Sequence, residues 1–410
     1  MCIKEDVVIL RKLARKYLEI ALNDHNSQRI VLHRAVNDLK MIRPVVLIDE
    51  LPWGEMNIDN ELTLLCEDKD FRQAEEYMRR TIYKFNHLRA DMIVRPYLPV
   101  KKVIHTTGDG IFVEETTLQI NQDTHIIAHE YNDQFADCEG LDKLHKEVIT
   151  YDEVETNRKF FKLAEAIGDI LPVKKVGIDN LGASPWDVIS RYRGVTPLLM
   201  DLLVEPEFSH ELMTKMTEII MDKNEQYRIL GLYDTDPNSL HCTTLLNSEL
   251  HPETDNKDYK NIWGRGAAQI FASVSKEMHD EFDIEYMKNI LGKCGLNYYG
   301  CCEPLDKKID IVEKIPNLRK ISITPWADVN IAAEAIGRKY VIASKPNPSS
   351  VSVGNLNTTE LRKEITKIMD ACYKNNCSFD MVLKDISTVA HRPENLFEWE
   401  KTVMDIAMNY

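Results

Sequence analysis

The stretch "LNYYGCCEPLDKKIDIVEKIPNLRKISITPWADVNIAAEAIGRKYVIASKPNP" (residues 296–348) contains three short apolar runs, and each ends in a polar or Gly/Pro-containing turn. Helical periodicity at 328–337 lies between the second run and the third. Strands that alternate with helices in this way are typical of βα units. Such units build a parallel sheet with right-handed crossovers.

The same rhythm extends outward from this stretch to about residue 43. Helical segments after residue 267 are expected at 285–294, 328–337 and 359–375. The nine candidate strand runs are 43–53, 90–100, 174–186, 238–246, 267–275, 296–304, 319–329, 339–348 and 379–388. Nine runs suit a closed eight-stranded barrel with one extra hairpin or one false strand. We therefore predict a (β/α)₈ TIM barrel. A doubly wound open sheet is the alternative, although no G-x-G-x-x-G follows an early strand.

Residues 1–42 are predicted to form an N-terminal helical extension, followed by a single barrel domain at 43–410. Apolar residues at roughly helical spacing predict helix over 5–40. A second amphipathic helix is expected at 70–88, with Asp70 as its N-cap.

The composition excludes several classes of protein. The chain has 410 residues, a formal net charge of −15 and 44% hydrophobic residues. Nucleic-acid binding needs a basic face, and so does binding to an anionic membrane surface, so we expect neither partner.

The segment "MCIKEDVVIL" (1–10) has an acidic pair where the apolar part of a signal peptide would begin. No window approaches 18 uninterrupted apolar residues, so no transmembrane helix is expected. The nine cysteines are irregularly spaced and odd in number. We therefore expect a cytoplasmic protein with reduced thiols.

In a parallel barrel the active site lies at the C-terminal ends of the strands. Several predicted strands carry a side chain suited to catalysis or binding at this end. These candidates are Glu50, His241, Gln269, Cys301, Cys302, Glu303, Lys345 and Lys384. By contrast, His279 and Glu55 fit structural roles better.

The adjacent thiols of Cys301 and Cys302 are open to three interpretations. They could be core-filling side chains, a redox pair, or metal ligands. A vicinal disulfide is strained, which disfavours the redox interpretation. Thiolates are soft donors suited to zinc, and a catalytic zinc needs about three protein ligands with one open position. His241, at another strand end, could complete such a site.

Several segments, in their order along the chain, resemble the uroporphyrinogen decarboxylase superfamily. "RYRGVTPLLMDLLVEPEFSHELMTKMTE" (191–218) resembles its arginine-x-glycine and D-L-x-x-x-P-E helix. "AAQIFASVSKEMHDEF" (267–282) is similar to its glutamine-serine strand, and "PENLFEWEKTV" (393–403) to its closing helix. The segment 298–329 sits where that family has an H-x-C-G strand end. The resemblance covers about 160–410 and implies a (β/α)₈ barrel.

The superfamily has two main chemistries, namely cofactor-free decarboxylation of uroporphyrinogen and zinc-dependent methyl transfer with a corrinoid protein. True decarboxylases open with an arginine-rich R-Q-A-G-R loop. The corresponding "DELPWGEM" (49–56) is acidic, which opposes a polycarboxylate substrate. The methyltransferases use H-x-C and a later cysteine as zinc ligands. In this chain Tyr299 or Gly300 replaces that histidine, and no later cysteine lies near "DISTVAHRP" (385–393). Only Cys301 or Cys302 therefore carries over directly.

The resemblance favours a zinc-dependent methyltransferase that moves a methyl group between a small methylated compound and a corrinoid carrier protein. An aryl methyl ether or a methylamine would be a suitable substrate. In this interpretation His241, Cys301 and Cys302 bind zinc, and Glu50 or Glu303 supplies a proton. Gln269, Lys345 and Lys384 bind substrate.

Two alternatives remain open. One is a cofactor-free lyase that decarboxylates a small or porphyrin-like acid, with Lys345 or Lys384 holding the carboxylate. The other is a non-catalytic barrel that binds a corrinoid or its carrier. For the methyltransferase, the net charge and the acidic segment 249–258 predict a carrier with basic residues around its cobalt face.

Overall fold

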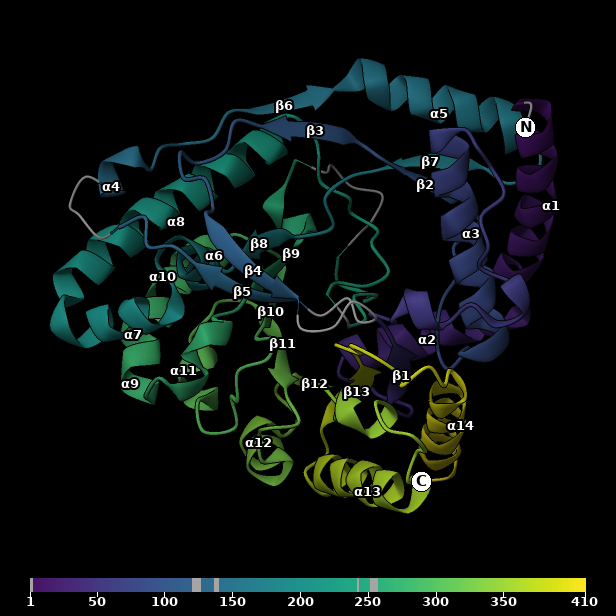
Figure 1. Ribbon diagram of the computed structural model, residues 1–410. Helices are drawn as coiled ribbons and strands as arrows, with labels where there is room; N and C mark the ends of the chain where they lie inside the picture. Colours follow the sequence, from purple (N-terminus) through teal and green to yellow (C-terminus); the bar gives the residue numbers. More distant parts are fainter. Residues whose placement is uncertain (1–2, 120–126, 136–139, 242, 251–256) are drawn as a thin grey trace.

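The computed structural model describes residues 3–119, 127–135, 140–241, 243–250 and 257–410. Its centre is a curved seven-stranded sheet whose neighbouring strands are all parallel (Figure 1). The strand order is β1 (Val45–Ile48), β13 (Ser378–Leu383), β12 (Val341–Ser344), β11 (Leu318–Ile323), β10 (Leu296–Tyr299), β9 (Trp263–Gly266) and β8 (Leu181–Ala183). The parallel α/β architecture agrees with the prediction.

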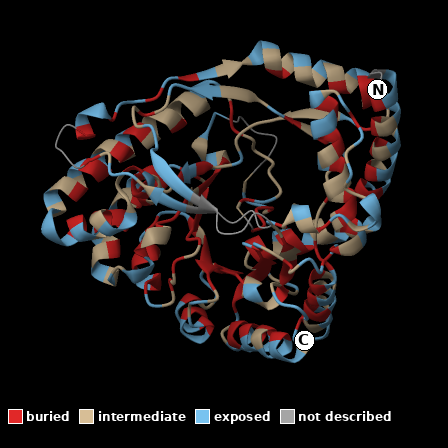
Figure 2. Cartoon of the chain, in the orientation of Figure 1, coloured by how far each residue is buried: buried red, intermediate tan, exposed pale blue. Residues whose placement is uncertain are grey.

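Each strand has one face toward the surrounding helices and one toward the interior of the curved sheet, because side chains alternate along a strand. The helix-facing residues Ile321, Ile342 and Met381 belong to the main hydrophobic core. The interior face is more varied, and it contains both a small apolar cluster that includes Tyr298 and Ala343 and buried charged groups described below. Figure 2 shows buried residues concentrated on the strands and on the inward faces of the helices.

The sheet does not close into a barrel, which corrects the prediction of eight closed strands. β1 and β8 are its two edges. The segment 89–97 lies beside β1, where Asp91 N–H donates to Val46 O at 3.0 Å. This segment forms no strand there, and the Asp91 carboxylate instead accepts Val46 N–H and pairs with Arg43. Pro96 also lacks a donor for a ladder.

Two of the nine predicted strands were wrong. The described residues 238–241 and 243–246 form a loop, in which a bridge joins Ser239 and Thr244 and residues 243–246 are buried. Residues 267–275 contain the 3₁₀ helix η4 (Gln269–Ser273), and the strand lies just before it, at β9. The sequence of β9 is "WGRG", so it has no apolar run to reveal it. Its glycines are needed for close packing, since a Cβ at Gly264 would lie 2.1 Å from Asn297 Oδ1.

Two further runs were only partly strands, and of their strands only β8 belongs to the main sheet. Residues 174–186 divide between β7 (Val173–Val176) and β8, and only the end of 90–100 forms β2 (Leu98–Lys101). β2 and β7 pair with each other outside the main sheet.

The helices surround the sheet in the order expected for βα units. Their bounds are α1 (Ile3–Ala21), α2 (Asp24–Asn37), α3 (Lys69–His87), α4 (Gly140–Lys143), α5 (Glu153–Ile167), α6 (Pro185–Arg193), α7 (Val195–Val204), α8 (Pro206–Ile229), α9 (Lys276–His279), α10 (Glu285–Leu291), α11 (Ile309–Val312), α12 (Val329–Ile336), α13 (Thr358–Lys374) and α14 (Glu394–Asn409). α1 packs against α3 and α5, whereas α2 packs against β1 and β13. The N-cap of α3 is Asp68 rather than Asp70, which instead pairs with Arg158 and Lys162.

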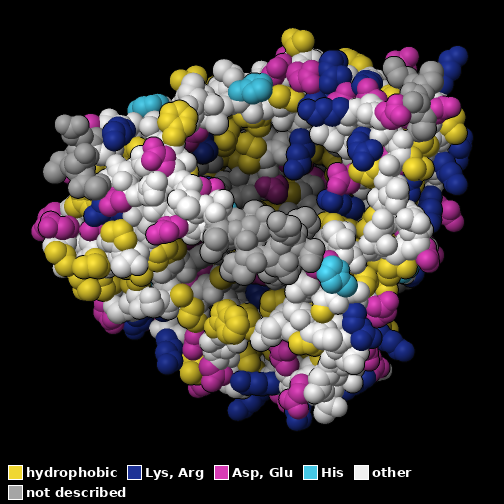
Figure 3. All heavy atoms as spheres, in the orientation of Figure 1, with side chains coloured by type: hydrophobic (Ala, Val, Ile, Leu, Met, Phe, Trp, Pro, Cys, Tyr) yellow, Lys and Arg dark blue, Asp and Glu magenta, His cyan; other side chains and the backbone are white. Residues whose placement is uncertain are grey.

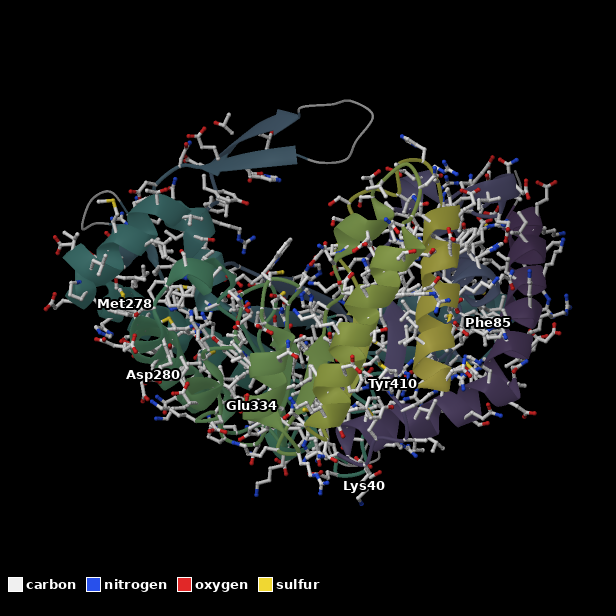
Figure 4. The ribbon with its side chains drawn as sticks, turned by 90° about the horizontal axis from the view of Figure 1, so that it is seen from below. Lys40, Phe85, Met278, Asp280, Glu334 and Tyr410 are labelled. Carbon is white, nitrogen blue, oxygen red and sulfur yellow. The ribbon has the colours of Figure 1, made fainter. Side chains whose placement is uncertain are left out.

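Two antiparallel pairs complete the described structure, β3 (Val103–Thr106) with β6 (Ile149–Asp152) and β4 (Glu115–Gln119) with β5 (Ile127–Tyr131). The β4–β5 hairpin projects away from the body of the molecule, opposite Lys40 (Figure 4). Because Lys40 precedes β1, the hairpin stands on the side of the strands' C-terminal ends. Within the described ranges no helix combines the length and the apolar character that a membrane crossing requires.

Candidate active site

The loop that follows β10 turns sharply at Gly300 and brings both thiols to the C-terminal end of the sheet. Gly300 has φ of +100°, a conformation that favours glycine. Its N–H donates to Gly266 O at 2.9 Å, which ties the turn to β9. A Cβ at this position would lie 2.6 Å from Leu305 Cδ1. Gly300 therefore explains why two adjacent cysteines can leave the alternation of the strand.

Glu303 holds this loop in place through hydrogen bonds to the backbone. Its Oε2 accepts Cys301 N–H at 3.0 Å, and its Oε1 accepts Ala268 N–H at 3.2 Å. The residue is fully buried, and burial raises its pKa to about 7. Because it has no exposed surface and both oxygens accept backbone N–H groups, this placement favours a positioning role over the predicted proton donation.

Three of the predicted ligands meet at this loop. His241 Nε2 lies 3.0 Å from Cys301 Sγ, and Cys301 Sγ lies 3.6 Å from Cys302 Sγ. Cys301 is buried, whereas Cys302 is partly exposed. The two sulfurs and the imidazole come from positions about 60 residues apart in sequence.

Lys384 and Asp385, directly after β13, form the other side of the cluster. Lys384 Nζ lies 3.7 Å from Cys301 Sγ and 4.0 Å from Cys302 Sγ, and it pairs with Asp385 Oδ2 at 2.9 Å. The exposed Glu50, after β1, accepts Asp385 N–H at 3.0 Å.

Three residues of the cluster have a strained backbone. Glu50, His241 and Asp385 have φ of 50°, 33° and 56°, and they are three of the eleven non-glycine residues with positive φ in the described structure. A non-glycine residue with positive φ is uncommon, and such residues cluster at functional sites. The other eight lie elsewhere in the chain, so these conformations are compatible with a functional site but do not identify one.

The surroundings stabilise a thiolate on Cys301. The Cys302 thiol as hydrogen-bond donor, with help from His241 and Lys384, lowers the pKa of Cys301 to about 3 against the opposing effect of burial. The same hydrogen bond and burial raise the pKa of Cys302. Although burial opposes it, the charges of Cys301 and Asp385 raise the pKa of Lys384, which therefore stays cationic.

The donor set suits zinc, which binds two thiolates and an imidazole in many sites. Around a tetrahedral zinc, neighbouring S and N ligand atoms lie about 3.5–3.8 Å apart, as follows from Zn–S and Zn–N lengths. The separation of Cys301 and Cys302 already matches this range, and His241 would have to retreat by about half an ångström. Among the described side chains, no group of three or more His, Cys, Asp or Glu is placed so that it could hold a metal ion without rearrangement.

Gln269 and Lys345 follow two other strands of the sheet, β9 and β12. Gln269 donates from its backbone N–H and its Nε2 to Asp187, at 2.9 and 3.1 Å. Lys345 follows β12, its side chain is buried, and its N–H donates to Ile323 O. Cys242 and most of the segment 249–258 lie outside the described residues.

Two residues of the cluster were not among the predicted site residues. Asp187, near the start of α6, is close enough to Cys301 for the thiolate charge to add to the effect of burial, which raises the pKa of Asp187. Asp385 contacts Cys302 Sγ at 3.8 Å. The sequence signal for Asp385 was its place at a strand end, whereas Asp187 lies inside a helical segment and gave no such signal.

A recess opens on the C-terminal face between the β3–β6 pair and the β4–β5 hairpin, with charged side chains on its rim (Figure 3). An active site at this face agrees with the general rule for parallel α/β barrels.

Comparison with known proteins gives little further information. No family model matches the chain, and no curated protein matches it. Among solved structures, a methyltransferase from Methanosarcina mazei is similar, with a TM-score of 0.45 and 9% sequence identity. The alignment covers 91% of this chain and 97% of that chain. At this score and identity, the similarity supports no conclusion about activity.

Proposed function

We propose that this chain is a zinc-dependent methyltransferase that moves a methyl group between a small methylated compound and a corrinoid carrier protein. The convergence of His241, Cys301 and Cys302 at the C-terminal end of the sheet carries the proposal. The motifs that resemble the uroporphyrinogen decarboxylase superfamily support it, together with the acidic segment 49–56 in place of the arginine-rich loop of the true decarboxylases. An aryl methyl ether or a methylamine fits as the methyl donor.

In this proposal Cys301, Cys302 and His241 would hold the zinc ion and leave one position open for substrate. Zinc would supply Lewis-acid chemistry at the heteroatom that carries the methyl group. Lys384, 3.7 Å from Cys301 Sγ, would offset the negative charge of the thiolates. Glu303 would hold the backbone of Cys301 in place through its hydrogen bond to the N–H.

The proposed transfer breaks the bond between the methyl carbon and the heteroatom and forms a bond between that carbon and the reduced cobalt of the carrier. The electron pair of the broken bond stays on the heteroatom, which then takes up a proton. We assign this proton to Glu50, because its side chain is exposed at the mouth while Glu303 is fully buried.

The lyase alternative is less well supported. A decarboxylase would need a cation available for the substrate carboxylate. Lys384 already pairs with Asp385 and faces the thiols.

The metal content tests the proposal. Protein purified without chelator after zinc-supplemented expression should contain about one zinc per chain, and Cys301→Ser/Cys302→Ser should lose it. His241→Gln should bind zinc more weakly, because one of three ligands is removed. Elemental analysis of the purified proteins gives the measurement.

Cys66→Ser serves as the matched control, because Cys66 is also a buried free thiol but lies in the separate core formed with α1 and α3. This variant should keep its zinc. A wild-type zinc content below about a tenth of an equivalent would contradict the proposed metal site.

A further inference from the structure

His241 lies in a tight turn inside the curved sheet. Leu240 N–H donates to Thr243 O, and Thr243 N–H donates to Leu240 O, both at 3.0 Å. This reciprocal pair joins the residues on either side of the bend in which His241 lies. His241 has a φ of +33°, in the left-handed region that is uncommon for a non-glycine residue.

The residues on both sides of the turn are buried in the interior of the sheet. Leu240 and Leu245 pack with Trp263 and Tyr298, which come from β9 and β10. The turn therefore rises through the interior of the sheet and presents His241 to the thiols at the C-terminal end.

A buried ion pair holds the base of this turn. Lys320 Nζ donates to Asp380 Oδ2 at 2.8 Å, to Thr243 Oγ1 at 2.9 Å and to Thr244 O at 2.9 Å. Thr243 Oγ1 in turn donates to Asp380 Oδ2 at 2.7 Å. Both charged side chains have zero exposure. All three ammonium hydrogens of Lys320 thus have acceptors, and two of these belong to the turn.

His33 forms a second tie to the same segment. Its Nε2 donates to Asp91 O at 2.8 Å, so its Nδ1 accepts the Thr244 hydroxyl at 2.7 Å. Burial lowers the pKa of His33 to about 4, so it stays neutral, as this arrangement requires.

A fully buried ion pair is weak evidence for stability, because desolvation offsets much of the attraction between the charges. Fixing one arrangement of a neighbouring segment is a better-supported role for such a pair. In this chain the neighbouring segment is the one that carries an imidazole to Cys301.

We propose that Lys320 and Asp380, acting through the hydroxyl of Thr243, are positioning residues that hold His241 beside Cys301 as the nitrogen donor of the site. The inference rests on the proposed zinc-binding function, which it deepens. It assigns a role to two charged residues that lie in the middle of strands β11 and β13, away from the strand ends.

The substitutions Thr243→Val and Thr243→Ser test this directly. Valine has nearly the shape of threonine but lacks the hydroxyl, whereas serine keeps it. We expect Thr243→Val to weaken zinc binding about 10- to 100-fold, the range found when supporting contacts of metal ligands are removed. Thr243→Ser should bind zinc like the wild type. Competition with a chromophoric chelator measures the affinity.

Cobalt substitution provides a readout that general destabilisation would not reproduce. The Co²⁺ form of Thr243→Val should keep the charge-transfer absorption of two thiolates but show shifted ligand-field bands, because the imidazole is displaced. Asp380→Asn should behave in the same way. Glu75→Gln is the matched control, because it alters another buried carboxylate, paired with Arg79 within α3, that has no hydrogen bond to the turn.

Wild-type zinc affinity together with an unchanged cobalt spectrum in folded Thr243→Val would overturn the inference. If the wild type itself binds no zinc, the proposed function fails, and the inference is then judged on the metal-free protein. There, the NMR signal of the His241 imidazole should be single in the wild type and in Thr243→Ser, and shifted or averaged in Thr243→Val. An identical His241 signal in all three proteins would overturn it.

Discussion

At the scale of single residues, Gly300 determines where the two thiols point. Gly300→Ala should destabilise the fold by about 1–3 kcal/mol, because alanine at φ of +100° is strained. It should also reduce zinc binding, since the turn would have to move away from Leu305. Chemical denaturation and zinc titration measure the two effects.

Gly354→Ala is the matched control for this prediction. Gly354 does not have a positive φ, and a Cβ there would meet nothing within 4 Å. The control should therefore be close to wild type in both measurements. Equal stability and equal zinc binding for the two alanine variants would show that the Gly300 turn does not organise the site.

Residue types alone made part of the site predictable. Cys301 and Cys302 were predicted to follow a strand end, and they follow β10, whereas His241 was predicted at the end of a strand that is a loop in the structure and reaches the thiols from there. The roles of Lys320 and Asp380 could not be predicted, because each is a charged residue within an apolar strand. Such a residue has no evident function until its partner on another strand is known. Their pairing across 60 positions is a property of the fold.

At the scale of elements, a buried hydrogen-bonded chain links β10 to the helices behind it. Lys308 Nζ donates to His279 Nδ1, so His279 Nε2 donates to Tyr299 Oη at 2.7 Å. Tyr299 in turn donates to Asp283 Oδ2 at 2.5 Å. Asp283 lies in the π-helical turn η5 (Asp280–Ile284), a form that is rare and often found at functional sites.

The buried carboxyl group of Asp283, at the end of this hydrogen-bonded series, predicts that the stability of the protein depends on pH. Burial raises the pKa of Asp283 to about 7, so the folded state holds a proton that the unfolded state has already lost above about pH 4. The free energy of unfolding should therefore fall as pH rises from about 4 to about 7, by on the order of a few kcal/mol from this group. Asp283→Asn should remove this contribution. Urea unfolding at several pH values measures it.

Asp310→Asn is the control for the urea measurement. It also removes a carboxylate, but Asp310 is exposed and paired with Lys276. This variant should retain the wild-type slope over the same pH range. If Asp283→Asn also retains that slope, Asp283 is not the group that holds the extra proton.

Strands and helices were predicted correctly where apolar residues recur with the period of the element. They were missed where two backbones approach closely and glycine replaces the apolar residues. β10 to β13 and the helices between them have apolar patterns that match their burial. β9 contains Gly264 and Gly266, whose small size is required by contact with Asn297 and Leu291. The strand therefore lacks the alternating apolar residues from which a strand can be predicted. The loop 238–246 is as apolar as a strand because it fills the interior of the sheet.

At the scale of the whole molecule, the open side of the sheet and the projecting β4–β5 hairpin leave the C-terminal face exposed, and Figure 3 shows both basic and acidic side chains around its recess. Residues 103–142 contain nine Asp or Glu and no Lys or Arg. Figure 4 shows the hairpin that this segment forms standing clear of the body on the side of the proposed site. In the proposed function, a carrier protein that docks beside the β4–β5 hairpin would meet the exposed carboxylates of Glu114, Glu115 and Glu130.

Methyl transfer to the matching carrier should consequently depend on salt. If the carrier has basic residues around its cobalt, the transfer rate at low concentration should fall as salt rises from about 20 to about 300 mM, because screening slows association. Single-turnover absorbance of the cobalt measures this rate. Glu114→Gln/Glu130→Gln, on the exposed hairpin, should be slower at low salt and less sensitive to salt. Glu334→Gln, far from the hairpin in Figure 4, should match the wild type.

An unchanged salt dependence in the hairpin variant would show that the carrier docks on another surface. Release of carbon dioxide from an acid substrate, without methylation of cobalt, would favour the lyase instead.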